Sequence, residues 1–213
     1  MGRIKDISTP AENDTSAELN YFFDVLDHFI NIAKTGVTHS SDESLTLITR
    51  APDSAIARAI LQYREKFAEI NIPMQIIFAH LTPSEYLCNW IDPEISPCGE
   101  TPTDNIRWAK RHNLLDAHEQ LTLSNHCSWS GESMRREVSS RFGFYIFDEN
   151  CPKAAIRGER SFNALWKISE TLPQAQIKRA KLARDSQFLG VHGEQNNFSS
   201  TEAGDHTSEF TRH

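Results

Sequence analysis

The sequence predicts an α/β fold with a mixed sheet that begins with a βαβ unit and carries helices on both faces. Residues 45–49 are rich in β-branched side chains and residues 74–79 are almost continuously apolar, as in strands buried on both faces. Between them, apolar residues recur at helical spacing from Ile56 through Phe67 to Ile70. A strand, a helix and a second strand in this order are typical of a parallel pair with a right-handed crossover.

The composition predicts one folded domain with loose ends. The chain has 213 residues, of which 38% are hydrophobic, and its mean hydropathy is −0.50. These values leave enough apolar side chains for one core and favour polar, unstructured termini. We therefore expect a disordered N-terminus over residues 1–14 and a single α/β domain over residues 15–173. Residues 174–213 are expected to form a tail that is first basic and then polar and disordered.

The other elements follow from caps, periodicity and alternation. Thr15 and Glu18 form a capping-box pattern before a periodic apolar stripe, which predicts a helix over residues 15–34. Pro102 directly after Thr101 is typical of a helix start. The further elements that we expect are helices over residues 84–91, 101–115 and 159–172, and strands over residues 119–124 and 142–147.

The net charge and the lengths of the apolar segments limit the classes of partner and the cellular compartment that we expect. The formal net charge is −7, which argues against a broad surface for nucleic acid or anionic membranes and leaves a local basic patch open. The basic stretch from Lys178 to Arg184 is interpreted as a solvated helix end. No apolar run approaches the roughly 20 residues of a membrane-spanning helix, and no secretory signal is visible. The sequence thus predicts a cytoplasmic protein.

The cysteines predict no disulfide framework. No Cys-x-x-Cys pair occurs among the four of them, so we interpret them as buried or idle thiols in a reducing compartment. The alternative is a zinc site, although its spacing matches no familiar ligand pattern. We therefore expect no metal and no other cofactor. The residues of that alternative site would be His112, His118, His126 and Cys127.

The most informative pattern is His118-x-Gln120-x-x-x-x-Asn125. It resembles the HxKxxxxD signature of the phospholipase D superfamily. Gly131-Glu132-Ser133-Met134 follows where that family has a Gly-Ser-x-Asn turn. With the βαβ segment before it and the strand and helix after it, the resemblance covers roughly residues 44–170.

The resemblance implies a phospholipase D-like fold, a phosphodiester ligand and a homodimer. In the intact family, one histidine attacks phosphorus, a second protonates the leaving group, and lysines hold the non-bridging oxygens. This chain has one such motif, so a complete site requires two copies, as in small bacterial members that form two-fold dimers. By this resemblance His118 is the candidate nucleophile or acid, with Gln120 and Asn125 beside it.

Three substitutions in the motif argue against catalysis. Gln120 replaces the lysine, Asn125 replaces the aspartate, and Glu132 replaces the small hydroxyl residue of the turn. The loss of one preorganised charged contact typically costs about 10²–10³ in rate. A carboxylate at the turn would also lie near the position of the phosphate and repel it.

Nearby residues could replace the positive charge that the motif loses with its lysine. Arg135 and Arg136 follow the turn, and guanidinium groups bind phosphate in a bidentate manner, so these arginines and Ser133 are the candidate phosphate-binding residues. Three hypotheses stay open. The protein is a non-catalytic or weakly active homodimer that binds a ligand or protein in its cleft, a phosphodiesterase or nuclease that acts through His118, or an unrelated α/β regulatory or interaction domain.

Overall fold

The centre of the fold is a mixed β-sheet. The structure is a computed structural model that describes residues 15–35, 44–99, 101–124, 127–134, 146–148 and 151–190. Within these residues the strand order is β6-β5-β4-β1-β2-β3-β7. β1, β2 and β3 are parallel, and the other strands join antiparallel. The bounds are β1 Leu45–Thr49, β2 Met74–Phe78, β3 Ile106–Trp108, β4 His118–Leu123, β5 Cys127–Ser133, β6 Ile146–Asp148 and β7 Glu170–Thr171.

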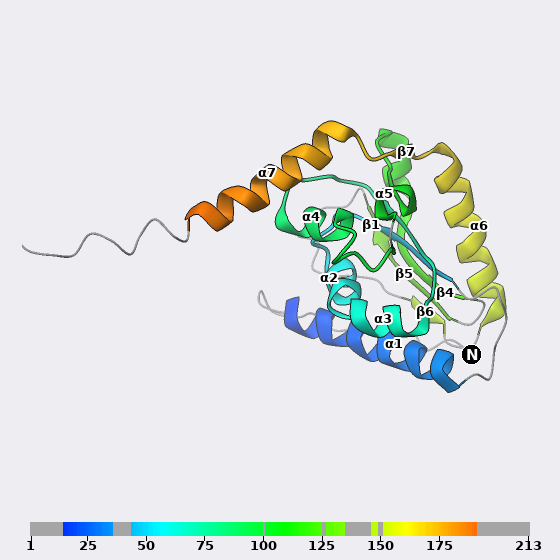
Figure 1. Cartoon of the computed structure of the whole chain (residues 1–213). Coiled ribbons are helices and arrows are strands. Elements are labelled where there is room, and N and C mark those ends of the chain that lie inside the picture. The colour runs from blue at the N-terminus through cyan, green and yellow to red at the C-terminus, as the bar shows by residue number, and fades with distance from the viewer. Residues whose placement is uncertain are drawn as a thin grey trace, which may run out of the picture.

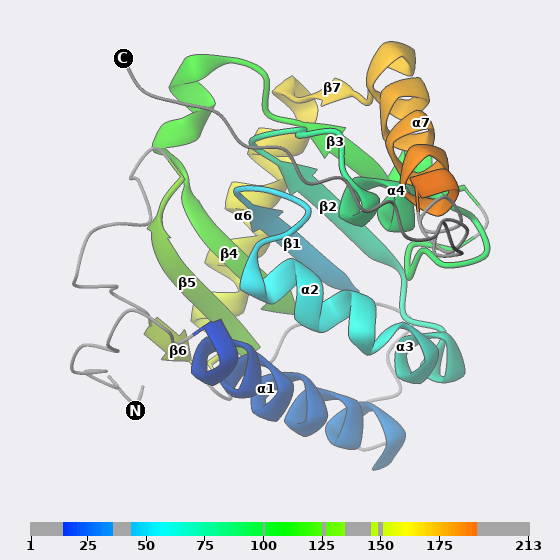
Figure 2. The ribbon, with the colours of Figure 1, turned by 90° about the vertical axis from the view of Figure 1, so that its left-hand side faces the viewer.

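Helices cover both faces of this sheet, which confirms the predicted fold class. Figure 2 shows α1 and α2 in front of the strands and α6 behind them. The elongated α1 runs along the outside of α2 and α3, while α6 lies on the opposite side of the molecule (Figure 1). The bounds are α1 Thr15–Thr35, α2 Ala55–Gln62, α3 Arg64–Ile70, α4 Glu85–Ile91, α5 Pro102–Asn105, the 3-10 helix η1 His112–Asp116, α6 Pro152–Ile168 and α7 Gln174–Gly190.

Two apolar layers hold the sheet between these helices. All five residues of β1 are buried, because alternate side chains enter the two layers. In the larger layer, Phe22 of α1 meets Trp129 of β5 edge to face, with 5.0 Å between the ring centroids. In the smaller layer, Ile48 and Ile77 pack against Phe162 of α6. Burial of each such side chain contributes about 1.5–3 kcal/mol to folding.

The predicted helix over residues 101–115 is wrong. Only Pro102–Asn105 is α-helical, after which the chain forms β3 and then η1. Ile106 is fully buried and pairs in register with Ile76 of β2. The hydrogen bonds of this sheet position outweigh the weak helical preference of the segment, which is a tertiary effect that local propensity does not contain.

The C-terminal segment also differs from the expectation. The helix expected over residues 159–172 begins earlier, at Pro152, and ends at Ile168. Residues 174–190, assigned to the tail from the sequence with their basic stretch interpreted as a solvated helix end, form the full helix α7. This helix is held against α4 by the buried Ala180 and by a 2.7 Å ion pair between Arg184 and Asp92.

Several of the predicted segments lie wholly or partly outside the residues that the structure describes. The N-terminal segment 1–14 and the end of the tail, residues 191–213, lie there, and of the strand expected over residues 142–147 only the last two residues are described. The helix expected between β1 and β2 is present but is divided at Tyr63 into α2 and α3. No helix in the described part of the chain has the length and apolar content needed to cross a bilayer.

Candidate functional site

Four side chains that carry titratable or charged groups come from one edge of the sheet. Arg50 follows β1, His80 follows β2 and Lys110 closely follows β3. His118 begins β4, which runs antiparallel to β1 and therefore starts at this same edge. The amide of His80 donates to the carbonyl oxygen of Arg50 at 2.7 Å, so the two loops leave the sheet together. Ligands of open α/β sheets bind at the carboxyl ends of parallel strands, which makes this edge the candidate site.

His118 is exposed at this edge and its ring has a defined orientation. Its Nδ1 lies 2.8 Å from the carbonyl oxygen of Gly131 on β5. A carbonyl oxygen only accepts, so Nδ1 carries the proton and the neutral ring keeps its lone pair on Nε2. Gly131 lies directly over Trp129, where a Cβ atom would come within 2.6 Å of the indole ring. The close approach of the backbone to Trp129 therefore requires glycine at the residue that orients His118.

Gln120, which the resemblance places at the motif's lysine position, lies under α6. It is 9% exposed, and its Nε2 donates to Thr122 Oγ1 at 2.9 Å. Gly158 of α6 packs over this amide, since a Cβ atom at Gly158 would lie 2.7 Å from Gln120 Nε2. The side chain is thus tied to its own strand and covered by a helix, an environment that suits a neutral amide better than a lysine ammonium.

Arg50 belongs to a compensated charge cluster that sequence reasoning missed. Its Nε lies 3.3 Å from Glu119 Oε2, and its Nη2 lies 3.8 Å from Glu132 Oε2. The three side chains are only 14%, 13% and 9% exposed, in the order Arg50, Glu119 and Glu132. Further hydrogen bonds reach Glu119 Oε1 from Thr49 Oγ1 at 2.8 Å and from the Arg50 amide at 3.1 Å.

The carboxylates beside Arg50 affect how an anionic ligand could bind to this arginine. One guanidinium lies beside two carboxylates here, and coulombic forces between them are strong where water is mostly excluded. A phosphate that approaches Arg50 therefore meets a cation that is already compensated. The sequence signal was the position of Arg50 directly after a buried strand, but its partners come from strands far along the chain.

The remaining motif residues divide into described and undescribed positions. Ser133 is half-buried, and its hydroxyl donates to the carbonyl oxygen of Leu115 at 3.1 Å. Asn125, Arg135 and Arg136 lie outside the described residues. The structure thus brings His118, Gln120 and Ser133 onto two neighbouring strands, and their catalytic or phosphate-binding roles stay predictions.

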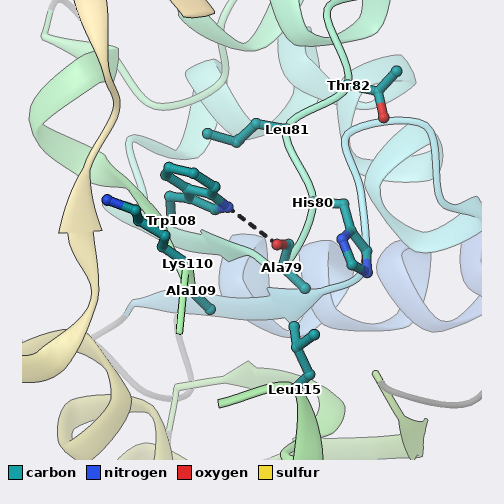
Figure 3. Close-up of a pocket in the computed structure, with 8 residues that line it drawn as sticks. All are labelled: Ala79, His80, Leu81, Thr82, Trp108, Ala109, Lys110 and Leu115. Atoms are coloured by element: carbon teal, nitrogen blue, oxygen red, sulfur yellow. Dashed lines mark hydrogen bonds between the residues drawn. The ribbon is translucent and has the colours of Figure 1, made fainter. Parts of the chain in front are cut away.

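A shallow hollow lies beside the charge cluster. It has a volume of about 290 Å³ and lies at the carboxyl ends of β2 and β3 (Figure 3). Trp108 forms one wall, and its indole N–H donates to the carbonyl oxygen of Ala79 at 3.1 Å. Lys110 lies at the rim, where its ammonium forms an exposed 3.2 Å ion pair with Glu170. The hollow therefore joins an aromatic surface to a cation that solvent reaches.

The described residues contain no group of three or more His, Cys, Asp and Glu side chains arranged to hold a metal ion. Of the alternative zinc set, His126 lies outside the described residues. None of the four cysteines, all of which are described, forms a disulfide, and Cys88, Cys98 and Cys127 are buried. Burial raises the pKa of the Cys98 thiol to about 12, which keeps it protonated and unreactive at neutral pH.

Comparison of the sequence with protein-family models gave no match, and comparison with curated proteins gave none either. The structure, in contrast, is similar to solved structures. Nuc of Salmonella typhimurium, a phospholipase D family member, has 10% identity and a TM-score of 0.42, over 70% of this chain and 91% of its own. The protein is structurally similar to the phospholipase D family.

Two further solved structures are similar at the same level. NucT of Helicobacter pylori has 11% identity and a TM-score of 0.44, over 72% of this chain and 94% of its own. TrmBL2, an archaeal chromatin protein described with a novel mode of DNA binding, has 10% identity and a TM-score of 0.43 over 74% of this chain and 65% of its own. These similarities concern the fold, and function depends on the side chains of the site.

Proposed function

We propose that this protein is a cytoplasmic phospholipase D-like protein that does not hydrolyse phosphodiesters and that binds a ligand or another protein at the edge of its sheet. The single observation that carries this proposal is the Arg50–Glu119–Glu132 cluster. Arg50, which follows β1 beside the motif strand β4, is compensated by two carboxylates, one of which stands where the resemblance expects a small hydroxyl residue.

The environment of Gln120 supports the same proposal. Phosphoryl transfer depends on positive charge aimed at the non-bridging oxygens, and a neutral amide provides much less of it. In addition, Gln120 donates to Thr122 and is covered by α6, so it does not reach toward the edge. Binding without turnover needs no such charge.

The hollow beside Trp108 suits a small ligand with an aromatic part and an anionic group. The indole and the neighbouring Leu81 offer apolar contact, and the exposed ammonium of Lys110 offers a charge at the rim. Both features are compatible with recognition and neither provides a nucleophile. A protein partner would use the same edge with a larger contact area.

The test uses bis-p-nitrophenyl phosphate, which is both aromatic and anionic. We expect no release of nitrophenol above the buffer rate, and weak binding of the ester in NMR titrations that Lys110→Ala reduces further. The matched control is Lys34→Ala, which removes an exposed cation on α1 and should leave binding unchanged. Turnover that disappears in His118→Ala would overturn the proposal.

A second function is favoured by one observation, the orientation of His118. A ring held through Nδ1, with the lone pair on Nε2, is arranged as a nucleophilic histidine requires. A phosphodiesterase would need a homodimer that brings two such rings together. Light scattering after size-exclusion chromatography tests the assembly, and a monomer would contradict this second function as well as the homodimer expected from the sequence.

A further inference from the structure

The outer face of α6 carries a stripe of cations. Lys153, Arg157, Arg160 and Lys167 follow at intervals of four, three and seven residues, which places them along one side of a helix. All four side chains are exposed. The only carboxylate of α6, Glu159, points about 120° away from the middle of this stripe. We call these four residues the α6 stripe.

No carboxylate of the described residues compensates the α6 stripe. None of its four cations forms an ion pair or a hydrogen bond with another described side chain. Three other surface lysines are paired: Lys34 with Glu69 at 2.8 Å, Lys66 with Asp27 at 2.7 Å and Lys110 with Glu170 at 3.2 Å. In a chain with a net charge of −7, four adjacent uncompensated cations form a distinct surface.

The place of α6 in the fold leaves this surface accessible to a large partner. Its inner face packs on the sheet through Ala155, Gly158 and Phe162. No other described helix covers the outer face, since α1, α2 and α3 lie on the far side of the sheet (Figures 1 and 2). The helix thus presents a rigid line of charge that spans about 21 Å from Lys153 to Lys167.

We propose that the α6 stripe binds the phosphate backbone of double-stranded nucleic acid without reading its sequence. A line of about 21 Å corresponds to roughly six base pairs of B-DNA, whose phosphates supply a dense row of negative charge. Lysine and arginine on a helix are suited to contact such a row. This surface lies apart from the motif edge, and the inference holds whether or not that edge hydrolyses phosphodiesters.

The chemistry of α6 favours duplex nucleic acid over other anionic partners. Proteins that bind single strands stack bases on exposed aromatic rings, whereas Phe162 is buried and Trp166 is half-buried and holds Arg107 against its ring. Helices that lie on membranes expose a broad apolar face. On α6 only Ile156 and Ile168 are large, apolar and exposed, and they flank the stripe on opposite sides.

The experiment measures the affinity of the full chain for a short labelled DNA duplex by fluorescence anisotropy over a series of salt concentrations. Four phosphate contacts predict that log K falls with log salt at a slope of about −3.6, or about a hundredfold loss between roughly 50 and 200 mM. The variant Arg157→Glu/Arg160→Glu should lose at least tenfold in affinity and flatten the slope. Arg157→Gln/Arg160→Gln should show the same changes to a smaller extent.

The matched control is Lys178→Glu/Arg179→Glu on α7, which changes the same amount of charge at two exposed helical positions. It should retain most of the affinity. An equal loss in this control would mean that net charge alone governs binding and would overturn the proposal. The proposal would also be overturned by no measurable affinity at low salt, or by binding to vesicles of anionic phospholipid without binding to the duplex. Circular dichroism of each variant verifies that the fold is retained.

Discussion

The sheet edge at Arg50 and the outer face of α6 differ in whether their cations are paired with carboxylates. At the edge, one mostly buried guanidinium faces two carboxylates across three strands. On α6, four exposed cations have no carboxylate partner among the described residues. The motif that resembles the phospholipase D signature therefore lies next to a compensated cation, whereas the four cations of the α6 stripe lie on a helix outside the site. Whether a cation serves a ligand depends on its neighbours rather than on its presence in a motif.

The largest expected effect is the loss of folding stability when Arg50 is removed from the compensated charge cluster. Arg50→Ala removes the cation that lies beside the mostly buried carboxylates of Glu119 and Glu132, and removal of one partner from such a cluster typically costs about 3–5 kcal/mol. Urea denaturation followed by circular dichroism measures the loss. The exposed pair of Lys34 and Glu69, removed by Lys34→Ala, should cost only a small part of that. Equal losses in the two variants would mean that the cluster contributes no more than a surface pair.

A second effect compares the two faces of α6. Gly158→Ala would place a Cβ atom 2.5 Å from Thr122 Oγ1 and 2.7 Å from Gln120 Nε2, so these side chains or the helix itself must shift. Overpacking of this kind costs about 1–3 kcal/mol, against a gain of up to about 1 kcal/mol in helix propensity. On the exposed face, Asn163→Ala has only the propensity gain and should slightly raise Tm. A Tm increase in both variants would contradict the close packing of α6.

The smallest effect concerns a compensated pair away from the edge. The hydrogen bond from Arg184 holds the pKa of Asp92 below its usual value, so this pair stabilises the fold when the pH is above the ordinary aspartate pKa. That stabilisation is lost as the pH falls through the folded-state pKa. Arg184→Ala should therefore lower Tm at neutral pH, and the difference from wild type should vanish in strong acid.

The control for this pH dependence is Arg179→Ala, which removes an exposed arginine of α7 that forms no ion pair with any described residue. Its Tm difference from wild type should be small at every pH. A difference for Arg184→Ala that persists unchanged into strong acid would show that the arginine stabilises α7 through packing rather than through Asp92.

The sequence predicted well those parts of the fold in which neighbours along the chain decide the structure. The strands β1 and β2 and the helical stripe between them followed from apolar spacing over residues 45–79. The prediction for the segment from Thr101 to Leu115 was wrong because a strand distant in the sequence decides its structure. Ile106 enters a strand because β2 lies beside it, and a helix-start signal at Pro102 contains nothing about that neighbour.

The candidate site divides in the same way. The motif identified His118 and Gln120, and the structure places both on β4. The sequence motif did not identify Arg50, because the partners of this arginine lie 69 and 82 residues further along the chain. Ion pairs at such separations arise only when β4 and β5 assemble beside β1.

By itself, the sequence determined the α/β class and the βαβ opening, and it contains the residue spacing on which the resemblance to the phospholipase D signature depends. These features depend on residue identity and local periodicity, which are complete in the chain. Only the tertiary structure decided that Arg50 is compensated, that Gln120 lies beneath α6, and that the cations of α6 point away from the sheet. Coulombic interactions and burial depend on distances in space, and the fold sets those distances.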